Sequence, residues 1–375
     1  MQTVCNAAPQ NIRPKPAMDP LQQDFLLILL LCFCSALIIA LSVTPVIIKI
    51  ARVKNLLVEP CERSAHLHKT PNLGGIAIFC AILCASCLWA NFTEINGIQY
   101  YIFALAVLFF IGVKDDLLQV SPQQKFAAQM IASLAVVALG DVRITSLQGF
   151  FGIYELYYWP SVGFTLVTFA FIINAYNLID GIDGLAGGLG IISAGFFAIF
   201  FAGTGHFAYA TIAISLVGAL AGFLRFNFSS KRKIFMGDTG SMLVGFFMSI
   251  FVVKFLYLEN FEAVFGFNNS PVVAVSILVI PLFDTIRVFI IRLLNGMSPF
   301  YPDRNHIHHL LLNSNLNHPQ ASVVLYLVNI LVVAISIVFF HDVDITVMFL
   351  LFAGVLMASS MFYNNPHGKT RRSAG

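Results

Sequence analysis

The side chains that could do chemistry gather in five short polar segments of an otherwise apolar chain: residues 49–73, 114–123, 178–183, 225–238 and 292–321. The most informative reads Asn-Ala-Tyr-Asn-Leu-Ile-Asp-Gly-Ile-Asp-Gly-Leu over residues 174–185, between two apolar runs. It holds two amides, Asn174 and Asn177, and two acids, Asp180 and Asp183. A carboxylate at bilayer depth costs roughly 2.5 to 3.5 kcal/mol on insertion scales. We therefore expect both acids to lie at the membrane interface or to face a polar cavity.

A second segment places a lysine near two adjacent acids. Asp115 and Asp116 end an apolar run, and Ser-Pro at residues 121–122 fits the N-cap and first position of the next helix. Lys125 would then project from the first turn of that helix towards the acids. Two adjacent aspartates alone are most simply a solvated loop, but a lysine within reach weakens that interpretation.

A third segment, residues 225–241, combines basic residues, glycines and an acid. The basic triplet at 231–233 is most simply a topology signal. The sequence Gly-Asp-Thr-Gly-Ser at 237–241 is different, because glycines let backbone N–H groups approach an anion and Asp238 suits Mg²⁺. This segment therefore predicts a phosphate-binding or metal-binding backbone turn at the start of a helix.

A fourth motif, Pro-Asp-Arg-Asn-His-Ile-His-His at residues 302–309, gathers one arginine and three histidines. His306 and His309 could share a helix face and hold zinc, but the remaining ligands at a familiar spacing are missing. A donor-rich cradle for phosphate, built from Arg304 and the histidines, fits better. Asp284 and Arg287, at i and i+3, are interpreted as an intramembrane ion pair and not as catalytic groups.

The composition requires a membrane protein. Of the 375 residues, 58% are hydrophobic and only 10% are charged, against about 25% charged residues in ordinary soluble domains. Uninterrupted apolar runs near 20 residues favour helices over a barrel. The fold class is therefore all-α and polytopic, with about eleven spans, or ten if two short or abutting ones merge. The expected spans are 25–48, 74–90, 98–113, 124–140, 160–177, 184–203, 206–224, 239–257, 271–291, 322–340 and 345–363.

Lysine and arginine set the expected orientation. With the N-terminus outside, 17 of the 21 basic residues fall in inner segments, as the positive-inside rule requires. The C-terminus is then cytoplasmic, and all the polar segments above share the cytoplasmic side. We expect a polar extracytoplasmic tail at 1–24, a single transmembrane catalytic domain at 25–363 and a basic cytoplasmic tail at 364–375.

Together the motifs resemble a known enzyme family. Asp115-Asp116 with Lys125, the Asn-x-x-Asn-x-x-Asp-Gly-x-Asp-Gly run at 174–184, Phe-Met-Gly-Asp at 235–238 and His-x-His-His at 306–309 look like the signature set of the polyprenyl-phosphate N-acetylhexosamine-1-phosphate transferases. The match runs in chain order from about residue 64 to residue 310. The Asp-Arg before the histidines is similar to the WecA-type undecaprenyl-phosphate N-acetylglucosaminyl 1-phosphate transferases, whereas the muramoyl branch has three consecutive histidines and lacks this pair.

The resemblance implies a reaction and a set of partners. The phosphate of undecaprenyl phosphate attacks the sugar-side phosphorus of a UDP-N-acetylhexosamine, most simply UDP-N-acetylglucosamine, and releases UMP. This is a first membrane step of cell-envelope polysaccharide synthesis, in the bacterial inner membrane with the active site facing the cytoplasm. The implied cofactor is Mg²⁺, with Mn²⁺ as an alternative. Nucleic acid is not an expected partner, and a homodimer is left open.

The resemblance also assigns roles to residues. A phosphate monoester has a second pKa near 6 and is already mostly ionised at neutral pH. Asp115 and Asp116 are therefore expected to be positioning or metal-linked groups first and a base second. Lys125 would neutralise a phosphate. The candidate catalytic residues are Asp115, Asp116, Lys125, Asp180 and Asp183; the candidate substrate contacts are Lys69, Thr70, Asn174, Asn227, Arg304, His306, His308 and His309; and the candidate metal ligands are Asp238 and Asn177.

Two alternatives remain at this stage. A muramoyl-pentapeptide phosphotransferase of peptidoglycan synthesis shares most of the motifs. A secondary transporter could use intramembrane acids to carry ions, but such proteins often show two repeated halves, and no convincing repeat is present. The polar groups also gather on one face, which suits alternating access poorly. The sequence leaves open the UDP-sugar and the polymer made from the product.

Overall fold

The chain folds into a bundle of helices. A computed structural model describes residues 20–57, 69–150, 152–258, 270–297, 306–313 and 316–339. A short antiparallel hairpin, β1 (Ser146–Phe150) and β2 (Ile153–Glu155), adds the strands of this part of the chain. The helices are α1 (Pro20–Val53), α2 (Gly74–Trp89), α3 (Ile98–Leu118), α4 (Pro122–Leu134), α5 (Tyr158–Ile179), α6 (Leu185–Gly203), α7 (Phe207–Asn227), α8 (Gly237–Tyr257), α10 (Ser270–Ile277), α11 (Val279–Leu294), α12 (Ile307–Asn313) and α13 (His318–Phe339), with short η1 (Phe92–Glu94) and η2 (Ala135–Leu139).

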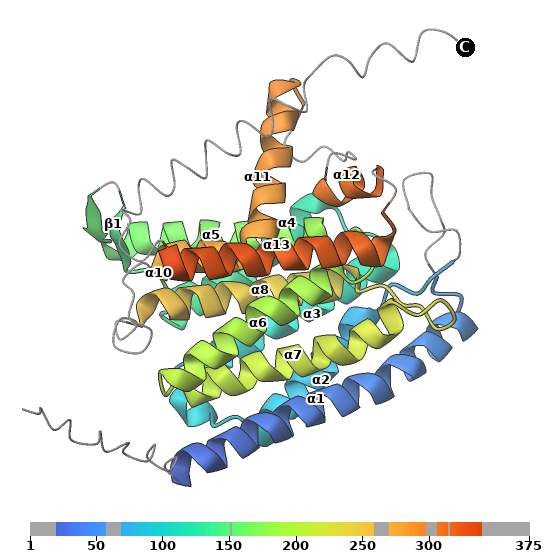
Figure 1. The fold of residues 1–375 in the computed structure, drawn as a ribbon, viewed down its shortest axis with the longest axis horizontal. Coiled ribbons are helices and arrows are strands. Elements are labelled where there is room, and N and C mark those ends of the chain that lie inside the picture. The colour runs from blue at the N-terminus through green and yellow to red at the C-terminus, as the bar shows by residue number, and fades with distance from the viewer. Residues whose placement is uncertain are drawn as a thin grey trace, which may run out of the picture.

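Helix α8 lies at the centre of the bundle. Nearly all of its residues are buried, and α2, α3, α5 and α6 pack around it (Figure 1). At its far end the packing is aromatic: Phe251 and Phe255 of α8 contact Phe197 and Phe200 of α6. A helix that is apolar all round must be enclosed by protein or lipid. The central position of α8 therefore fixes its first residue, Gly237, inside the molecule.

The structure confirms the predicted class, a helical protein with several membrane-spanning helices. Among the described residues, six helices are long and apolar enough to cross a bilayer: α1 from Asp24 onwards, α5, α6, α7, α8 and α13. The pair α10 and α11 together makes a seventh candidate, and α2 is apolar but shorter. The fold is therefore all-α, polytopic and membrane-embedded, while the number of about eleven spans remains a prediction. The expected span at 345–363, the C-terminal tail and residues 1–19 of the expected N-terminal tail lie outside the described residues, whereas residues 20–24 of that tail form the start of α1.

The predicted span at 271–291 is broken into two helices. Helices α10 and α11 meet at Leu278 with a bend of 78°, and α11 stands across the other helices (Figure 1). Pro281 explains the break, because it cannot donate a backbone hydrogen bond to the carbonyl of Ile277. That carbonyl instead accepts from Ser193 Oγ at 3.1 Å and from Asn329 Nδ2 at 3.2 Å.

The start of α4 follows the sequence prediction. Ser121 is the N-cap, and its hydroxyl accepts a hydrogen bond from the backbone N–H of Gln124 at 3.4 Å, with Pro122 at the first helical position. The helix changes to a π-helical turn after Leu134, so the predicted span at 124–140 is two consecutive pieces. The beginning of α4 directs Lys125 towards the first residues of α8.

Candidate active site

The N-terminus of α8 is capped by an acid from another helix. Asp116, at the end of α3, accepts hydrogen bonds from the backbone N–H groups of Asp238 at 2.7 Å and Thr239 at 3.1 Å, and from the Thr239 hydroxyl at 2.6 Å. The Asn72 amide donates to the same carboxylate at 3.0 Å. The first N–H groups of a helix lack intrahelical partners and carry a partial positive charge. Asp116 therefore ties α3 to the start of α8.

Glycines allow the close approach that this cap needs. Gly237 has φ +76°, and a Cβ there would lie 2.7 Å from either carboxylate oxygen of Asp116. Gly75 of α2 lies directly against Gly240 of α8, so that a Cβ on Gly75 would come within 2.2 Å of the Gly240 nitrogen. Gly112 of α3 likewise contacts the Thr239 backbone. The backbones of α2, α3 and α8 thus meet without intervening side chains.

Lys125 lies between residues of three other helices. Its ammonium is 3.1 Å from Asp115 Oδ2, 3.3 Å from Asn177 Oδ1, and in direct contact with Asp238 Oδ1. The Asn177 amide donates to Asp238 and to Ser241 Oγ, the latter at 2.9 Å. The other oxygen of Asp115 accepts from the backbone N–H of Val120 at 2.6 Å. The structure therefore brings Lys125, Asp115 and both candidate metal ligands together, whereas the sequence predicted only the approach of Lys125 to the two adjacent acids.

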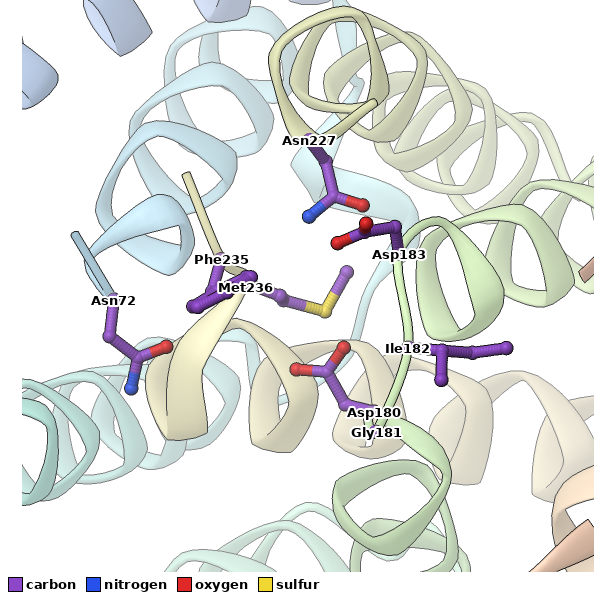
Figure 2. A pocket seen from close by; sticks show the side chains of 8 residues that line it. All are labelled: Asn72, Asp180, Gly181, Ile182, Asp183, Asn227, Phe235 and Met236. Carbon is purple, nitrogen blue, oxygen red and sulfur yellow. The ribbon is translucent and has the colours of Figure 1, made fainter. Parts of the chain in front are cut away.

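A polar cavity opens beside this cluster. It has a volume of about 180 Å³, and Figure 2 shows the carboxylates of Asp180 and Asp183 entering it from one loop, opposite Met236. Burial raises the pKa of Asp180 to about 8, and the charges of Asp238, Asp116 and Asp183 add to the rise. Burial likewise raises the pKa of Asp116 to about 7. The cavity is lined by Asn72, Asp180, Gly181, Ile182, Asp183, Asn227, Phe235 and Met236.

The second acid of the loop lies beside a lysine and a histidine. Asp183 Oδ2 lies 2.6 Å from the Lys233 ammonium and 3.4 Å from His318 Nδ1. Asn227 also lines the cavity, but its amide is committed to the backbone: its oxygen accepts from Gly184 N at 2.6 Å and its nitrogen donates to the Ile234 carbonyl at 2.9 Å. This geometry favours a structural role for Asn227 over the predicted contact with the substrate.

The histidines lie on the other side of the loop. Burial, reinforced by the neighbouring His309, lowers the pKa of His308 to about 3, so this ring is neutral at physiological pH. The ring packs on Gly181, where a Cβ would come within 2.4 Å of His308 Nε2. His306 Nδ1 is 2.7 Å from Asp284 Oδ2, and the Ile307 N–H donates to the other oxygen at 2.7 Å. Asp284 therefore holds the histidine motif in place. The sequence predicted only an ion pair between Asp284 and Arg287.

The remaining predicted residues are less central. Asn174 donates to Gln129 Oε1 at 2.9 Å and to the Ala170 carbonyl at 2.7 Å, which fits a role in holding neighbouring helices together. Thr70 is buried and Lys69 is exposed, two and three residues before Asn72. Arg304 lies outside the described residues.

Several residues of the site were not predicted. Asn72 joins it through Asp116, and the signal was its place just before the paired glycines that begin α2. Lys233 was taken only as part of a topology signal, yet it is the ion-pair partner of Asp183. Thr239 and Ser241 lie in a segment singled out for its glycines, and their hydroxyls contact Asp116 and Asn177.

Comparison with known proteins identifies the family of the chain. Residues 98–256 match glycosyl transferase family 4. The chain is 32% identical over 295 residues to the undecaprenyl-phosphate alpha-N-acetylglucosaminyl 1-phosphate transferase of Yersinia pestis, covering 77% of this chain and 78% of that protein. It is 32% identical over 315 residues to the protein of the same name from Escherichia coli K12 (81% and 82% covered). For the probable undecaprenyl-phosphate N-acetylglucosaminyl 1-phosphate transferase of Bacillus subtilis, the identity is 32% over 301 residues (80% and 82%). The chain therefore belongs to glycosyl transferase family 4, with these membrane transferases among its relatives.

Proposed function

We propose that this protein transfers N-acetylglucosamine 1-phosphate from UDP-N-acetylglucosamine to undecaprenyl phosphate and releases UMP. The observation that carries the proposal is the meeting of Lys125, Asp238 and Asn177 at the start of α8, beside a cavity entered by Asp180 and Asp183. The relatives' names supply the acceptor and the sugar. The inner membrane, with this end of the bundle facing the cytoplasm, is the proposed location.

The charge balance of the site supports a divalent cation. Five carboxylates (Asp115, Asp116, Asp180, Asp183 and Asp238) adjoin the cavity or its neighbouring cluster, and the lysine partners that the described contacts show for them are Lys125 and Lys233. Two anionic substrates must enter this acidic region. Repulsion among these groups is the condition that a bound cation relieves.

The donor atoms also suit Mg²⁺. Carboxylate and amide oxygens are the ligands that hard cations prefer, and three such oxygens, from Asp115, Asp238 and Asn177, already converge on the Lys125 ammonium. We propose that Asp238 and the Asn177 oxygen hold Mg²⁺, with Asp180 close to it. The bound ion would neutralise the diphosphate of the donor and the charge on the departing UMP.

The residues of the chain perform the remaining tasks of the transfer. An oxygen of the acceptor phosphate forms a bond to the sugar-side phosphorus, the bond from that phosphorus to the bridging oxygen breaks, and UMP leaves with that oxygen. No base is required, because the acceptor phosphate is mostly ionised at neutral pH. Lys125 binds phosphate oxygens, and Asp115 fixes it by holding both the ammonium and the turn at Val120.

An apolar groove supports a lipid substrate. A cavity of about 430 Å³ runs along α3 between Phe103 and Lys114, with Ala128 of α4 on its other side. Lys114 immediately precedes Asp115, and Ala128 lies one helical turn after Lys125. The groove thus lies along the two helices that carry Asp115 and Lys125, which suits a substrate with a hydrocarbon chain and a charged head.

The test is a radiochemical or coupled assay of UMP release. Purified protein with UDP-N-acetylglucosamine, undecaprenyl phosphate and Mg²⁺ should produce UMP and a diphosphate-linked lipid sugar. Asp238→Asn should abolish turnover, whereas Asp141→Asn, at an exposed acid paired with Arg143 in another part of the chain, should not. Turnover with UDP-N-acetylmuramoyl-pentapeptide instead would favour the muramoyl alternative. The absence of turnover with any UDP-N-acetylhexosamine would refute the proposal.

A further inference from the structure

Helix α13 places three polar side chains on one of its faces. His318, Ser322 and Tyr326 follow one another at intervals of four residues, so they lie above one another along the helix. Most of the neighbouring residues of this helix are apolar, and Leu327 and Leu331 are exposed as expected for a lipid-facing surface. Ser322, by contrast, is fully buried. The polar stripe therefore faces the protein interior.

All three side chains reach the same two residues of the cavity loop. His318 Nδ1 is 3.4 Å from the Asp183 carboxylate, the Ser322 hydroxyl donates to the Asp183 carbonyl at 2.8 Å, and the Tyr326 hydroxyl donates to the Gly184 carbonyl at 2.5 Å. The sequence separation between partners is large: 139 residues for Ser322 and 142 for Tyr326. Contacts of this kind are invisible to motif analysis.

The end of α7 holds the loop from the opposite side. Asn227 accepts from the Gly184 N–H, and Gly184 has φ +81°, with the Phe228 ring lying where a Cβ would be. The carbonyls of both loop residues and the N–H of Gly184 thus have partners from α7 or α13. Space for Tyr326 comes from Gly188 of α6, where a Cβ would lie 2.1 Å from the tyrosine ring.

We propose that the first half of α13 positions the Asp183–Gly184 turn and thereby sets the affinity for the nucleotide sugar. Ser322 and Tyr326 are positioning residues: they contact the backbone of the loop and act on the substrate through the Asp183 carboxylate. This inference rests on the proposed function, because it assigns the cavity beside Asp183 to the UDP-sugar. The inference predicts that loss of these contacts weakens binding of the UDP-sugar and not of undecaprenyl phosphate. The reason is that Lys125, the proposed phosphate-binding residue, is held by Asp115 and Asn177 and not by α13.

The kinetic test uses variants that remove one hydroxyl each. Ser322→Ala and Tyr326→Phe should raise the KM for UDP-N-acetylglucosamine about three- to tenfold, the range expected for one net hydrogen bond, and leave the KM for undecaprenyl phosphate unchanged. Ser336→Ala is the matched control on the same helix, because this buried hydroxyl bonds only the Val333 carbonyl of its own helix among the described contacts. Tyr101→Phe is a second control, since its hydroxyl pairs with Tyr209 elsewhere in the bundle.

A second measurement keeps the inference testable without activity. In hydrogen–deuterium exchange of the full-length protein, the amides of residues 180–188 should exchange faster in Ser322→Ala and Tyr326→Phe, and at the wild-type rate in Ser336→Ala. Unchanged exchange in both variants would overturn the inference, as would equal rises in the KM values of both substrates. If the wild-type protein turns over no UDP-sugar, the proposed function fails, while the exchange result still decides whether α13 holds the turn.

Discussion

The Asp116 cap makes a prediction whose sign depends on pH. Burial raises the pKa of this carboxyl from its ordinary value of 3.8 to about 7 in the folded chain. A folded-state pKa above the unfolded value means that the folded state binds more protons across that window. The free energy of unfolding should therefore fall as pH rises from about 4 to about 7, by up to roughly 4 kcal/mol for a shift of this size. Above pH 7 the loss is complete.

The substitution Asp116→Asn removes this dependence and keeps one oxygen acceptor. The variant retains a partner for the Asp238 N–H, but its amide nitrogen can no longer accept from Thr239, which is fully buried. An unpaired buried donor costs about 1 to 3 kcal/mol. At pH 5, where wild-type Asp116 is protonated, the variant should be the less stable protein. At pH 8 the penalty for ionising Asp116 offsets that cost, so the difference should shrink or reverse.

Thermal unfolding in detergent, with EDTA present and at pH 5 and pH 8, measures the difference. Asp180 titrates in the same direction, and because burial, the largest cause of its raised pKa, is the same in both proteins, most of its contribution cancels in the comparison. Asp141→Asn is the control, because the Asp141 side chain is 70% exposed and its loss should change stability by less than about 0.5 kcal/mol at either pH. A stability difference between the wild type and the Asp116→Asn variant that is the same at both pH values would refute the account of a buried, capping carboxylate.

Three further predictions concern the same site. Lys125→Met should reduce kcat at least about a hundredfold, the scale of removing one preorganised electrostatic group, while the protein still folds; near-normal turnover would exclude Lys125 from binding the transferred phosphate. Asp180 has a pKa of about 8, and Mg²⁺ favours the ionised carboxylate, so the Mg²⁺ concentration for half-maximal turnover should fall as pH rises from 6.5 to 8. The substitution Asp180→Asn should make this concentration less dependent on pH. An equal pH dependence in both proteins would contradict the role given to Asp180. Gly75→Ala should lower the unfolding temperature strongly, because the new methyl group would lie 2.2 Å from the Gly240 nitrogen. The control Gly195→Ala should be neutral or stabilising, because its methyl group would meet nothing within 4 Å. Similar unfolding temperatures of the two variants would contradict the close backbone contact.

Much of the site was predictable because its parts lie at helix ends. The Ser-Pro pair at 121–122 fixes the start of α4, and the start of α4 fixes the direction of Lys125, so its approach to Asp115 follows from local rules. The apolar runs predict most helices within a few residues for the same reason. Local sequence patterns determine where each helix begins and ends, and they thereby place the site residues that lie at helix ends.

The contacts that sequence reasoning missed are long-range. Asn72 and Asp116 are 44 residues apart, and Ser322 lies 139 residues from Asp183. The bend between α10 and α11 is an intermediate case: Pro281 signals a break, but the angle depends on Ser193 and Asn329, which satisfy the freed carbonyl of Ile277. Packing of distant segments, which no spacing rule encodes, selects these partners.

The glycine contacts and the acidic cluster depend on each other. Asp116 can reach the backbone N–H groups of α8 only because Gly112, Gly75 and Gly240 let three backbones approach without side chains between them. That approach brings Asp116 close enough to raise the pKa of Asp180 through its charge. Mutual repulsion among these acids favours separation, and the packed glycines oppose it. The bundle thereby holds an arrangement of carboxylates that a flexible loop would relax.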